Sequence, residues 1–232
     1  MKTLAIIPAR GGSKRIPNKN IKDFCGSPMI SHVLKAADMA NIFEKIHVST
    51  DSERISAVVE DLGFNVDFQR PTDISDDYAT VMDVLRFTVA EYEARNEFFD
   101  IVCLLYATSP LITPTDIKTA YEKFIASDKK RALLSVTAYP TPVEKAWIVN
   151  EDQALIPKNS ESFSKRTQDL IPAYYDAGMF CFYTPDYIKQ TSGAGNSNGF
   201  RAFVVPSYRV TDIDEPEDWE RAELLFKAAQ NI

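Results

Sequence analysis

The sequence contains few of the residues that build disulfide frameworks or metal clusters. Only three cysteines and two histidines occur in 232 residues, and the cysteines lie far apart, with no C-x-x-C pair among them. This usage is typical of reduced core thiols and argues against disulfide bridges or zinc ligation. Apolar runs are also short, well below the roughly 18 residues that a membrane span requires. We therefore expect a soluble, cytoplasmic protein without a membrane partner.

Several familiar site motifs are absent as well. There is no G-x-x-x-x-G-K-[ST] and no G-x-G-x-x-G followed by an acid, so neither a P-loop nor a dinucleotide site is indicated. No G-x-S-x-G occurs, and a chain with two histidines gives a serine-hydrolase triad little support. The net charge of −7 disfavours nucleic acid as a partner, because nucleic-acid binding requires a basic surface.

What the chain does contain is a regular alternation of apolar strands and amphipathic helices. Its 45% hydrophobic content suffices for one sizeable core, so we expect a single domain over residues 1–232. The alternation predicts a three-layer α/β fold, a mainly parallel sheet with helices on both faces. Strands are predicted at 4–7, 45–50, 64–68, 101–105, 132–137, 178–183 and 202–206. Helices are predicted after the caps Ser27, Asp51, Asp76 or Asp77, and Thr113, after Thr184, and over 215–229.

The loop after the first strand carries the strongest functional signal. Gly11 and Gly12 lie among five cations that come between the first strand and the first acid of the chain: Arg10, Lys14, Arg15, Lys19 and Lys22. Glycines permit positive φ, which turns backbone N–H groups toward an anion, and long cationic side chains bond phosphate oxygens. The loop also follows the carboxyl end of a strand, where open α/β sheets bind ligands. We expect a small, highly charged anion here, with a solvated basic turn as the alternative.

A second candidate stretch lies near the other end of the chain. Asp212 and Asp214 flank Ile213 in an extended segment, so both carboxylates are expected on one face while Ile213 turns into the core. Mg²⁺ usually takes one or two protein carboxylates and completes its shell with water and substrate phosphates. The alternative is that Asp214 caps a helix, with Glu217 at the capping-box position. Beside a phosphate loop, the metal site is the favoured interpretation.

The regular pattern loosens between residues 138 and 172. Prolines recur at positions 140, 142, 157 and 172, and connections this long are usually functional or exchanged with a partner. We expect a protruding arm within the single domain, not a second core. Lys145 and Arg166 lie in this segment and Arg70 in another loop. Each is a candidate for a surface salt bridge, although an arginine such as Arg166 can also clamp a carboxylate.

With these features in place, the chain resembles the CMP-nonulosonate synthetases, the cytidylyltransferases that activate nine-carbon acidic sugars. The resemblance spans nearly the whole length and implies a nucleotide-diphospho-sugar transferase-like fold. Its most specific part is Ile-Pro-Ala-Arg-Gly-Gly-Ser-Lys at 7–14 with Lys19-Asn20, which is similar to the family's CTP-binding signature. Supporting segments are 48–51, 70–71 with 75–77, 108–111 and 212–214.

The resemblance implies a role for each candidate residue. The triphosphate would be held by Arg10, Gly11, Gly12, Ser13, Lys14, Lys19 and Asn20. Cytosine and ribose would lie near Arg70, Asp77, Ala79 and Thr80. Asp212 and Asp214 would bind Mg²⁺, the implied cofactor. The sugar acid would meet Tyr106, Thr108, Ser109, Lys145, Arg166 and Asp176, partly from a neighbouring subunit, so that residues 138–172 would be the dimerisation arm of a homodimer.

Two departures from the sialic-acid members bear on the sugar. Those members have Gln at the position of Tyr106, and Asn-Gly where this chain has Asp176-Ala177-Gly178. Members that activate pseudaminic acid are more similar at 176–178, and also at 14–17, 75–80 and 212–214, although Met179 stands where that subgroup leads us to expect a polar residue. Pseudaminic acid is the expected substrate, and sialic, legionaminic and Kdo-type acids are the alternatives.

The expected reaction is nucleotidyl transfer. The anomeric hydroxyl of a 2-keto sugar acid would attack the α-phosphorus of CTP in line, and pyrophosphate would leave. Such catalysis depends mostly on positioning and on neutralising phosphate charge, so the expected catalytic residues are Arg10, Lys19, Asp212 and Asp214. A non-catalytic CTP-sensing module is the alternative from another class, and the metal pair argues against it.

Overall fold

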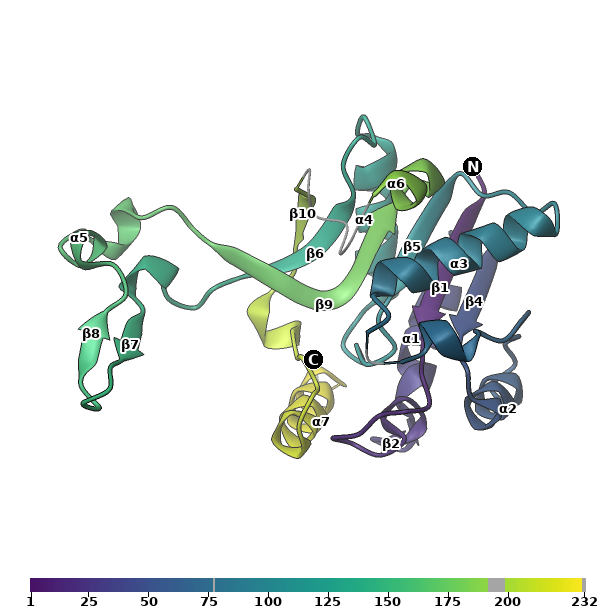
Figure 1. Ribbon diagram of the computed structural model, residues 1–232, viewed down its shortest axis with the longest axis horizontal. Helices are drawn as coiled ribbons and strands as arrows, with labels where there is room; N and C mark the ends of the chain where they lie inside the picture. Colours follow the sequence, from purple (N-terminus) through teal and green to yellow (C-terminus); the bar gives the residue numbers. More distant parts are fainter. Residues whose placement is uncertain (77, 192–198, 231–232) are drawn as a thin grey trace.

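The computed structural model describes residues 1–76, 78–191 and 199–230. A six-stranded sheet lies at the centre of these residues, in the order β10-β6-β9-β5-β1-β4 (Figure 1). Its strands are β1 (Thr3–Pro8), β4 (Lys45–Ser49), β5 (Ile101–Leu105), β6 (Leu133–Ala138), β9 (Tyr174–Tyr183) and β10 (Arg201–Val204). Neighbouring strands pair in parallel except β9, which is antiparallel to both β5 and β6. The predicted mainly parallel sheet is confirmed, with one antiparallel strand that the sequence pattern did not indicate.

Helices cover both faces of this sheet. They are α1 (Met29–Ala40), α2 (Glu53–Asp61), α3 (Val81–Ala94), α4 (Pro114–Ile125), α5 (Ser160–Phe163), α6 (Pro185–Gln190) and α7 (Pro216–Gln230). Short 3₁₀ turns occur at Lys19–Ile21, Thr72–Ile74, Val143–Lys145, Thr167–Asp169 and Ser207–Arg209. Within the described ranges, no helix has both the length and the apolar character needed to cross a bilayer.

Strand β1 shows why the fold has three layers. Leu4 and Ile6 belong to the core cluster that contains α3 and α6, whereas Ala5 and Ile7 belong to the cluster that contains α1, α2 and α4. Successive side chains of a strand point to opposite faces, and all four of these residues are fully buried. A strand that is apolar on both sides must be covered on both sides, as the sequence predicted.

Helices α2 and α3 are capped by other residues than the predicted ones. The hydroxyl of Ser52 caps α2, and Thr80 forms a reciprocal capping box with Asp83 at the start of α3. The predictions that Asp51 caps α2 and Asp76 caps α3 are therefore wrong. Several nearby residues of suitable type compete for each cap position. The Asp51 side chain accepts the Gly11 N–H instead, and that of Asp76 accepts the N–H groups of Tyr78 and Ala79.

Two short segments also differ from the prediction. Ser27 does not cap α1, because it forms β3 (Ser27–Pro28), which pairs with β2 (Asp23–Phe24) in a small hairpin. Residues 64–68 form no strand, since the sheet ends at β4. The ring of Phe68 stacks on His47 with centroids 4.4 Å apart, so this segment packs its side chains against the last strand without extending the ladder.

The β2–β3 hairpin joins the beginning of the chain to its end. Phe24 is fully buried and meets Trp219 of α7 edge to face, with ring centroids 5.3 Å apart. The Lys22 ammonium lies 4.5 Å from the centroid of the same indole ring, and Ile16 and Ile213 belong to the same core cluster. This packing fixes the loop after β1 against the segment that precedes α7.

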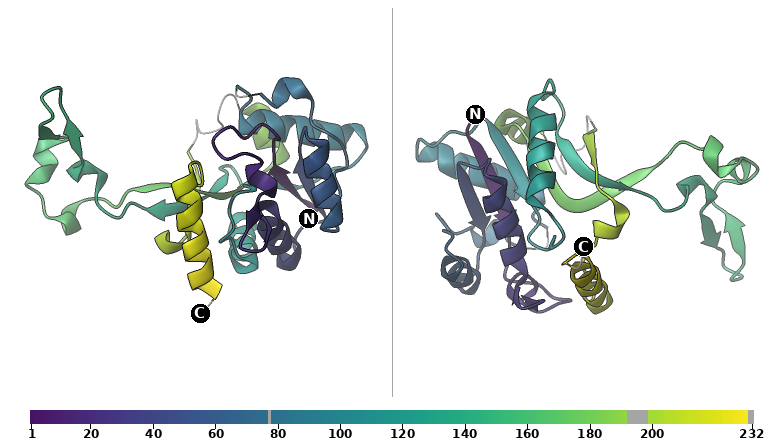
Figure 2. Two further views of the ribbon diagram at one scale, coloured as in Figure 1. Left: turned by 90° about the horizontal axis from the view of Figure 1, so that it is seen from below. Right: turned by 180° about the vertical axis from the view of Figure 1, so that it is seen from behind.

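A long segment between β6 and β9 projects away from the sheet (Figures 1 and 2). It carries the hairpin of β7 (Trp147–Val149) and β8 (Leu155–Pro157) together with α5. Its residues have little to pack on beyond contacts such as Trp147 with Phe163, whose ring centroids lie 4.6 Å apart. Large apolar side chains consequently stay exposed on Trp147, Ile148, Val149, Leu155 and Ile156. We call residues 138–172 the arm, and its role in dimerisation stays a prediction.

His47 makes the stability of the fold sensitive to pH. Its ring is fully buried against Phe68 and Tyr92, and neither ring nitrogen has a hydrogen-bond partner among the described residues. Burial lowers its pKa from 6.5 to about 4. The unfolded chain therefore binds a proton between these two values that the folded chain does not, so stability falls as pH drops from 6.5 toward 4.

We expect the wild type to lose about 2 kcal/mol between pH 7 and pH 5 through this group. In urea unfolding at the two pH values, His47→Phe should lose clearly less, because its ring has no proton to bind. Most carboxylates stay ionised over this range, so they contribute little to the difference. Equal losses in the two proteins would contradict the assignment.

Candidate functional site

The loop after β1 lies at the carboxyl edge of the sheet, but its glycines do not adopt the predicted backbone conformation. Neither Gly11 nor Gly12 has a positive φ; the left-handed residue of the loop is Asn18, with φ of 55°. The Gly11 N–H donates to Asp51 Oδ1 at 3.0 Å. A Cβ on Gly11 would lie 3.0 Å from Ser52 Cβ, so close approach to the loop after β4 is what requires glycine here.

Asp51 also faces Arg70, the most buried cation of the site. Arg70 is 5% exposed, its Nη2 lies 3.9 Å from Asp51 Oδ1, and its Nε donates to Ser75 Oγ at 3.0 Å. Burial, as the largest cause, lowers the pKa of this guanidinium. Nη2 has no hydrogen-bond partner among the described residues. A buried donor without a partner is costly, so Arg70 is poised to bind an acceptor supplied by a ligand.

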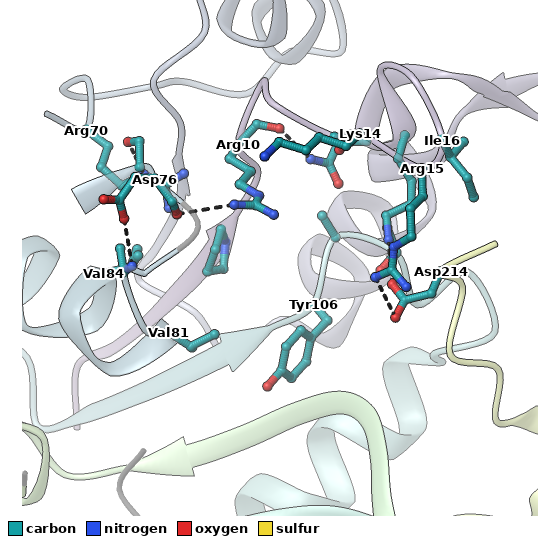
Figure 3. Close-up of a pocket in the computed structure, with 18 of the residues that line it drawn as sticks. Arg10, Lys14, Arg15, Ile16, Arg70, Asp76, Val81, Val84, Tyr106 and Asp214 are labelled. Carbon is teal, nitrogen blue, oxygen red and sulfur yellow. Dashed lines mark hydrogen bonds and ion pairs between the residues drawn. The ribbon is translucent and has the colours of Figure 1, made fainter. Parts of the chain in front are cut away.

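Arg10 and Asn20 shape the opposite wall. Asn20 is buried and donates from Nδ2 to the Arg10 carbonyl oxygen at 3.0 Å, which fixes the loop where it leaves β1. Arg10 Nη1 donates to the backbone carbonyl of Asp76 at 3.2 Å, and the Asp76 carboxylate in turn accepts the N–H of Ala79 at 2.8 Å. In Figure 3 the side chains of Arg10 and Lys14 extend over the cavity from the same loop.

The amino-terminal cations converge with the acidic segment before α7. Lys19 Nζ donates to the Ile213 carbonyl at 2.5 Å and lies 3.3 Å from Asp214 Oδ1. Arg15 Nη2 lies 2.9 Å from Asp214 Oδ2 (Figure 3). Ile213 is 1% exposed, which confirms that it turns into the core. The Asp218 carboxylate accepts the N–H groups of Asp214 and Glu215, directly before α7.

These side chains enclose a cavity of about 370 Å³. The predicted site residues that line it are Arg10, Ser13, Lys14, Lys19, Asn20, Arg70, Ala79, Tyr106, Thr108 and Asp214. Arg15, Ser75 and Asp76 line it too, with the apolar residues Ile74, Val81 and Val84 on one side. The cavity is therefore cationic at the glycine loop, acidic at Asp214 and partly apolar near α3.

Other predicted residues lie outside this cavity. Thr80 caps α3, and Ser109 is buried and donates its hydroxyl hydrogen to the Gly178 carbonyl at 2.6 Å, joining the loop after β5 to β9. Lys145 and Arg166 lie on the arm, where Arg166 is 75% exposed and paired with Asp169. Asp77, predicted to lie near the nucleotide and as a possible cap of α3, falls outside the described residues.

A second cavity of about 310 Å³ shares Tyr106 and Val81 with the first. Asp176 and Thr80 line it, together with apolar residues of the sheet. Burial raises the pKa of Tyr106, and the nearby Asp176 and Asp212 carboxylates raise it further. The pKa of Asp176 is raised by burial and then by Asp212. The carboxylates of Asp176 and Asp212, both predicted site residues, thus lie near each other beside Tyr106.

Asp212 and Asp214 suit a divalent cation by the chemistry of their donors. They supply carboxylate oxygens from alternate positions of one non-helical segment, held by the buried Ile213 between them. Among the described residues, no group of three or more His, Cys, Asp or Glu forms a self-sufficient metal site. A pair of carboxylates is nevertheless what Mg²⁺ uses when substrate phosphates complete its coordination shell.

Sequence reasoning missed the roles of two residues, Asp51 and Arg209, that hold the site together. Asp51 was taken as a helix cap, although it follows β4 at the same sheet edge where Arg10 follows β1, and that position was the available signal. Arg209 was not singled out; it binds Asp116 through two bonds of 2.6 and 2.9 Å. That bidentate pair anchors the segment leading to Asp212 onto the start of α4, and no local pattern indicates it.

Comparison with known proteins gives a consistent result. The family model described as "Cytidylyltransferase" matches residues 4–179. The pseudaminic acid cytidylyltransferase of Campylobacter jejuni subsp. jejuni serotype O:2 is 39% identical over 98% of this chain and 97% of its own length. The CMP-N,N'-diacetyllegionaminic acid synthase of Legionella pneumophila is 31% identical over 99% of this chain and 98% of its own.

A solved structure extends the likeness to the fold. A CMP:2-keto-3-deoxy-manno-octonic acid synthetase complexed with CTP superposes with a TM-score of 0.73. The match covers 100% of both chains at 21% sequence identity.

The two loop glycines provide a matched pair of substitutions. Gly11→Ala should destabilise the protein by about 1–3 kcal/mol, because the new methyl group meets Ser52 at 3.0 Å and overpacks the loop. Gly12→Ala has no atom within 4 Å of its new Cβ and should leave stability unchanged or slightly raised. Urea unfolding of the two variants tests this, and a larger loss for Gly12→Ala would overturn it.

Proposed function

Because this chain belongs to the cytidylyltransferase family, we propose that it makes CMP-pseudaminic acid from CTP and pseudaminic acid. One observation carries the proposal: the cations of the loop after β1 and the Asp214 carboxylate line a single cavity. A ligand that is itself a polyanion and also brings a divalent cation can bind both kinds of group at once. A nucleoside triphosphate with Mg²⁺ fits that description.

In this proposal the nucleotide lies across the cavity. Arg10, Lys14 and Lys19 bind the phosphates along the glycine loop. Nη2 of Arg70, which has no hydrogen-bond partner among the described residues, donates to the nucleoside end. Val81 and Val84 give that end an apolar wall. Asp212 and Asp214 would hold Mg²⁺, which supplies charge neutralisation at the α-phosphate.

The chemical step requires positioning more than covalent help from the protein. The anomeric oxygen of the sugar acid forms a bond to the α-phosphorus, the bond from that phosphorus to the bridging oxygen breaks, and pyrophosphate leaves. Lys19 and Arg10 neutralise the charge that accumulates on the departing group. The hydroxyl proton is lost to solvent or to a nearby carboxylate. Tyr106, Thr108 and Asp176 line the region beside the loop after β5, where the sugar acid would approach.

We further propose that the protein is a cytoplasmic homodimer in which the arm of one subunit completes the site of the other. Lys145 and Arg166 are expected to meet the sugar acid, but in this chain they stand on the arm, which projects away from the sheet (Figure 1). The exposed apolar side chains of the arm, among them Trp147 and Leu155, are suited to burial against a second copy.

The proposed function is tested by a substrate panel. Purified protein with CTP and Mg²⁺ is offered pseudaminic, legionaminic, N-acetylneuraminic and Kdo acids, and pyrophosphate release is measured. We expect the highest kcat/KM for pseudaminic acid and a loss of about a hundredfold or more in Arg10→Ala. Tight CTP binding without turnover of any acid would refute the enzyme and favour a CTP-sensing module.

The arm is tested by complementation between two inactive variants. If Arg166 acts in the partner's site, co-expressed Arg10→Ala and Arg166→Ala chains form mixed dimers with one intact site, restoring about one quarter of wild-type activity. If Arg166 acts within its own chain, the mixture stays inactive. Arg201→Ala, which alters an exposed arginine paired with Asp128, replaces Arg166→Ala in the control mixture.

A further inference from the structure

Arg15 makes contacts that the proposed function leaves unexplained. It lines the cavity, yet its guanidinium is directed at carboxylates, not at the space where phosphates would lie. Nη2 lies 2.9 Å from Asp214 Oδ2, and Nη1 donates to Glu215 Oε1 at 3.2 Å. These contacts span about 200 positions of sequence, so they connect the glycine loop directly to the proposed metal segment.

Asp214 is consequently engaged on both of its oxygens. Oδ2 faces Arg15 and Oδ1 faces Lys19, which also donates to the Ile213 carbonyl. A carboxylate held by two cations is a poor ligand for a third, because an incoming divalent ion is repelled by both and must displace them. The same two cations have an alternative partner whenever a triphosphate occupies the cavity that they line.

We propose that Arg15 is a positioning residue that couples metal binding to nucleotide binding. This inference rests on the proposed function. With no nucleotide present, Arg15 holds the Asp214 carboxylate away from divalent metal. When a triphosphate binds, its oxygens draw the guanidinium toward them, and Asp214 becomes free to ligate the cation that accompanies the phosphates.

The exposure of the pair suits such an exchange. The Arg15 side chain is 56% exposed and that of Asp214 is 40% exposed, and ion pairs between exposed groups are weak. A buried pair would resist separation, whereas this one can be broken by a ligand that offers several phosphate oxygens to the guanidinium. Because Glu215 also holds Arg15, the guanidinium stays near the cavity after it leaves Asp214.

The coupling has a thermodynamic signature. If Arg15 competes with metal only when nucleotide is absent, metal must bind more tightly in the presence of CTP, and CTP more tightly in the presence of metal, by the same factor. Part of this mutual strengthening of CTP and metal binding comes from direct contact between metal and phosphate. The rest comes from Arg15, and removing the Arg15 side chain abolishes that part.

The experiment measures Mn²⁺ binding by titration calorimetry, with and without CTP, in the wild type and in Arg15→Ala. We expect Arg15→Ala to bind Mn²⁺ alone about two- to fivefold more tightly, the range for an exposed ion pair. The ratio of Mn²⁺ affinities with and without CTP should fall by a similar factor. Arg15→Lys keeps the charge and should lie between the two, and Arg201→Ala should match the wild type.

The opposite results separate this inference from the proposed function. Unchanged or weaker binding of Mn²⁺ alone in Arg15→Ala overturns the coupling role, since a residue that merely orients Asp214 for metal would weaken binding when removed. If the wild type transfers CMP but Arg15→Ala keeps the wild-type ratio, only the coupling fails. If the wild type binds no CTP, the proposed function itself fails.

Discussion

The site depends on one junction, where the loop after β1 is held against the segment before α7. Apolar packing makes the junction, through Phe24 and Trp219 with Ile213 buried beside them. The polar contacts depend on this packing, because Lys19 and Arg15 reach Asp214 only when the two segments already lie side by side. The order matters energetically. Exposed ion pairs contribute little to the free energy of folding. Several buried apolar side chains contribute enough to hold the charged groups together, which their own attraction would not do.

Much of the fold could be predicted from the sequence because the strands are apolar on both faces and the helices carry regular apolar stripes. Those signals are local. The antiparallel direction of β9 could not be predicted, since the direction of a strand depends on the path of the preceding connection and not on the residues of the strand itself. The cap of α2 was assigned to the neighbouring residue, because Asp51 and Ser52 are both suitable and only the approach of Gly11 removes Asp51 from the choice.

The candidate site was partly predictable for the same reason. Arg10, Lys14 and Lys19 form a visible cluster, and Asp214 belongs to a recognisable acidic pair. The conformation that joins them was not predictable: the glycines serve close packing where positive φ was expected. Asn20 supports a backbone carbonyl, and Ser109 joins the loop after β5 to β9. Residues chosen for their chemistry therefore proved in several cases to be the scaffold that positions others, which only the tertiary structure reveals.

The reversed direction of β9 has a geometric consequence for the arm. β6 runs parallel to β5 in the sheet and ends at Ala138, and β9 begins opposite it at Tyr174. The segment between them is, topologically, an enlarged hairpin turn that leaves and rejoins the sheet at the same edge as the loops after β1 and β4. Had β9 been parallel, the chain would have crossed to the far rim first. Insertions in this turn can change length and composition while leaving the ladder intact, so it is the region where related proteins can diversify with least cost to the sheet.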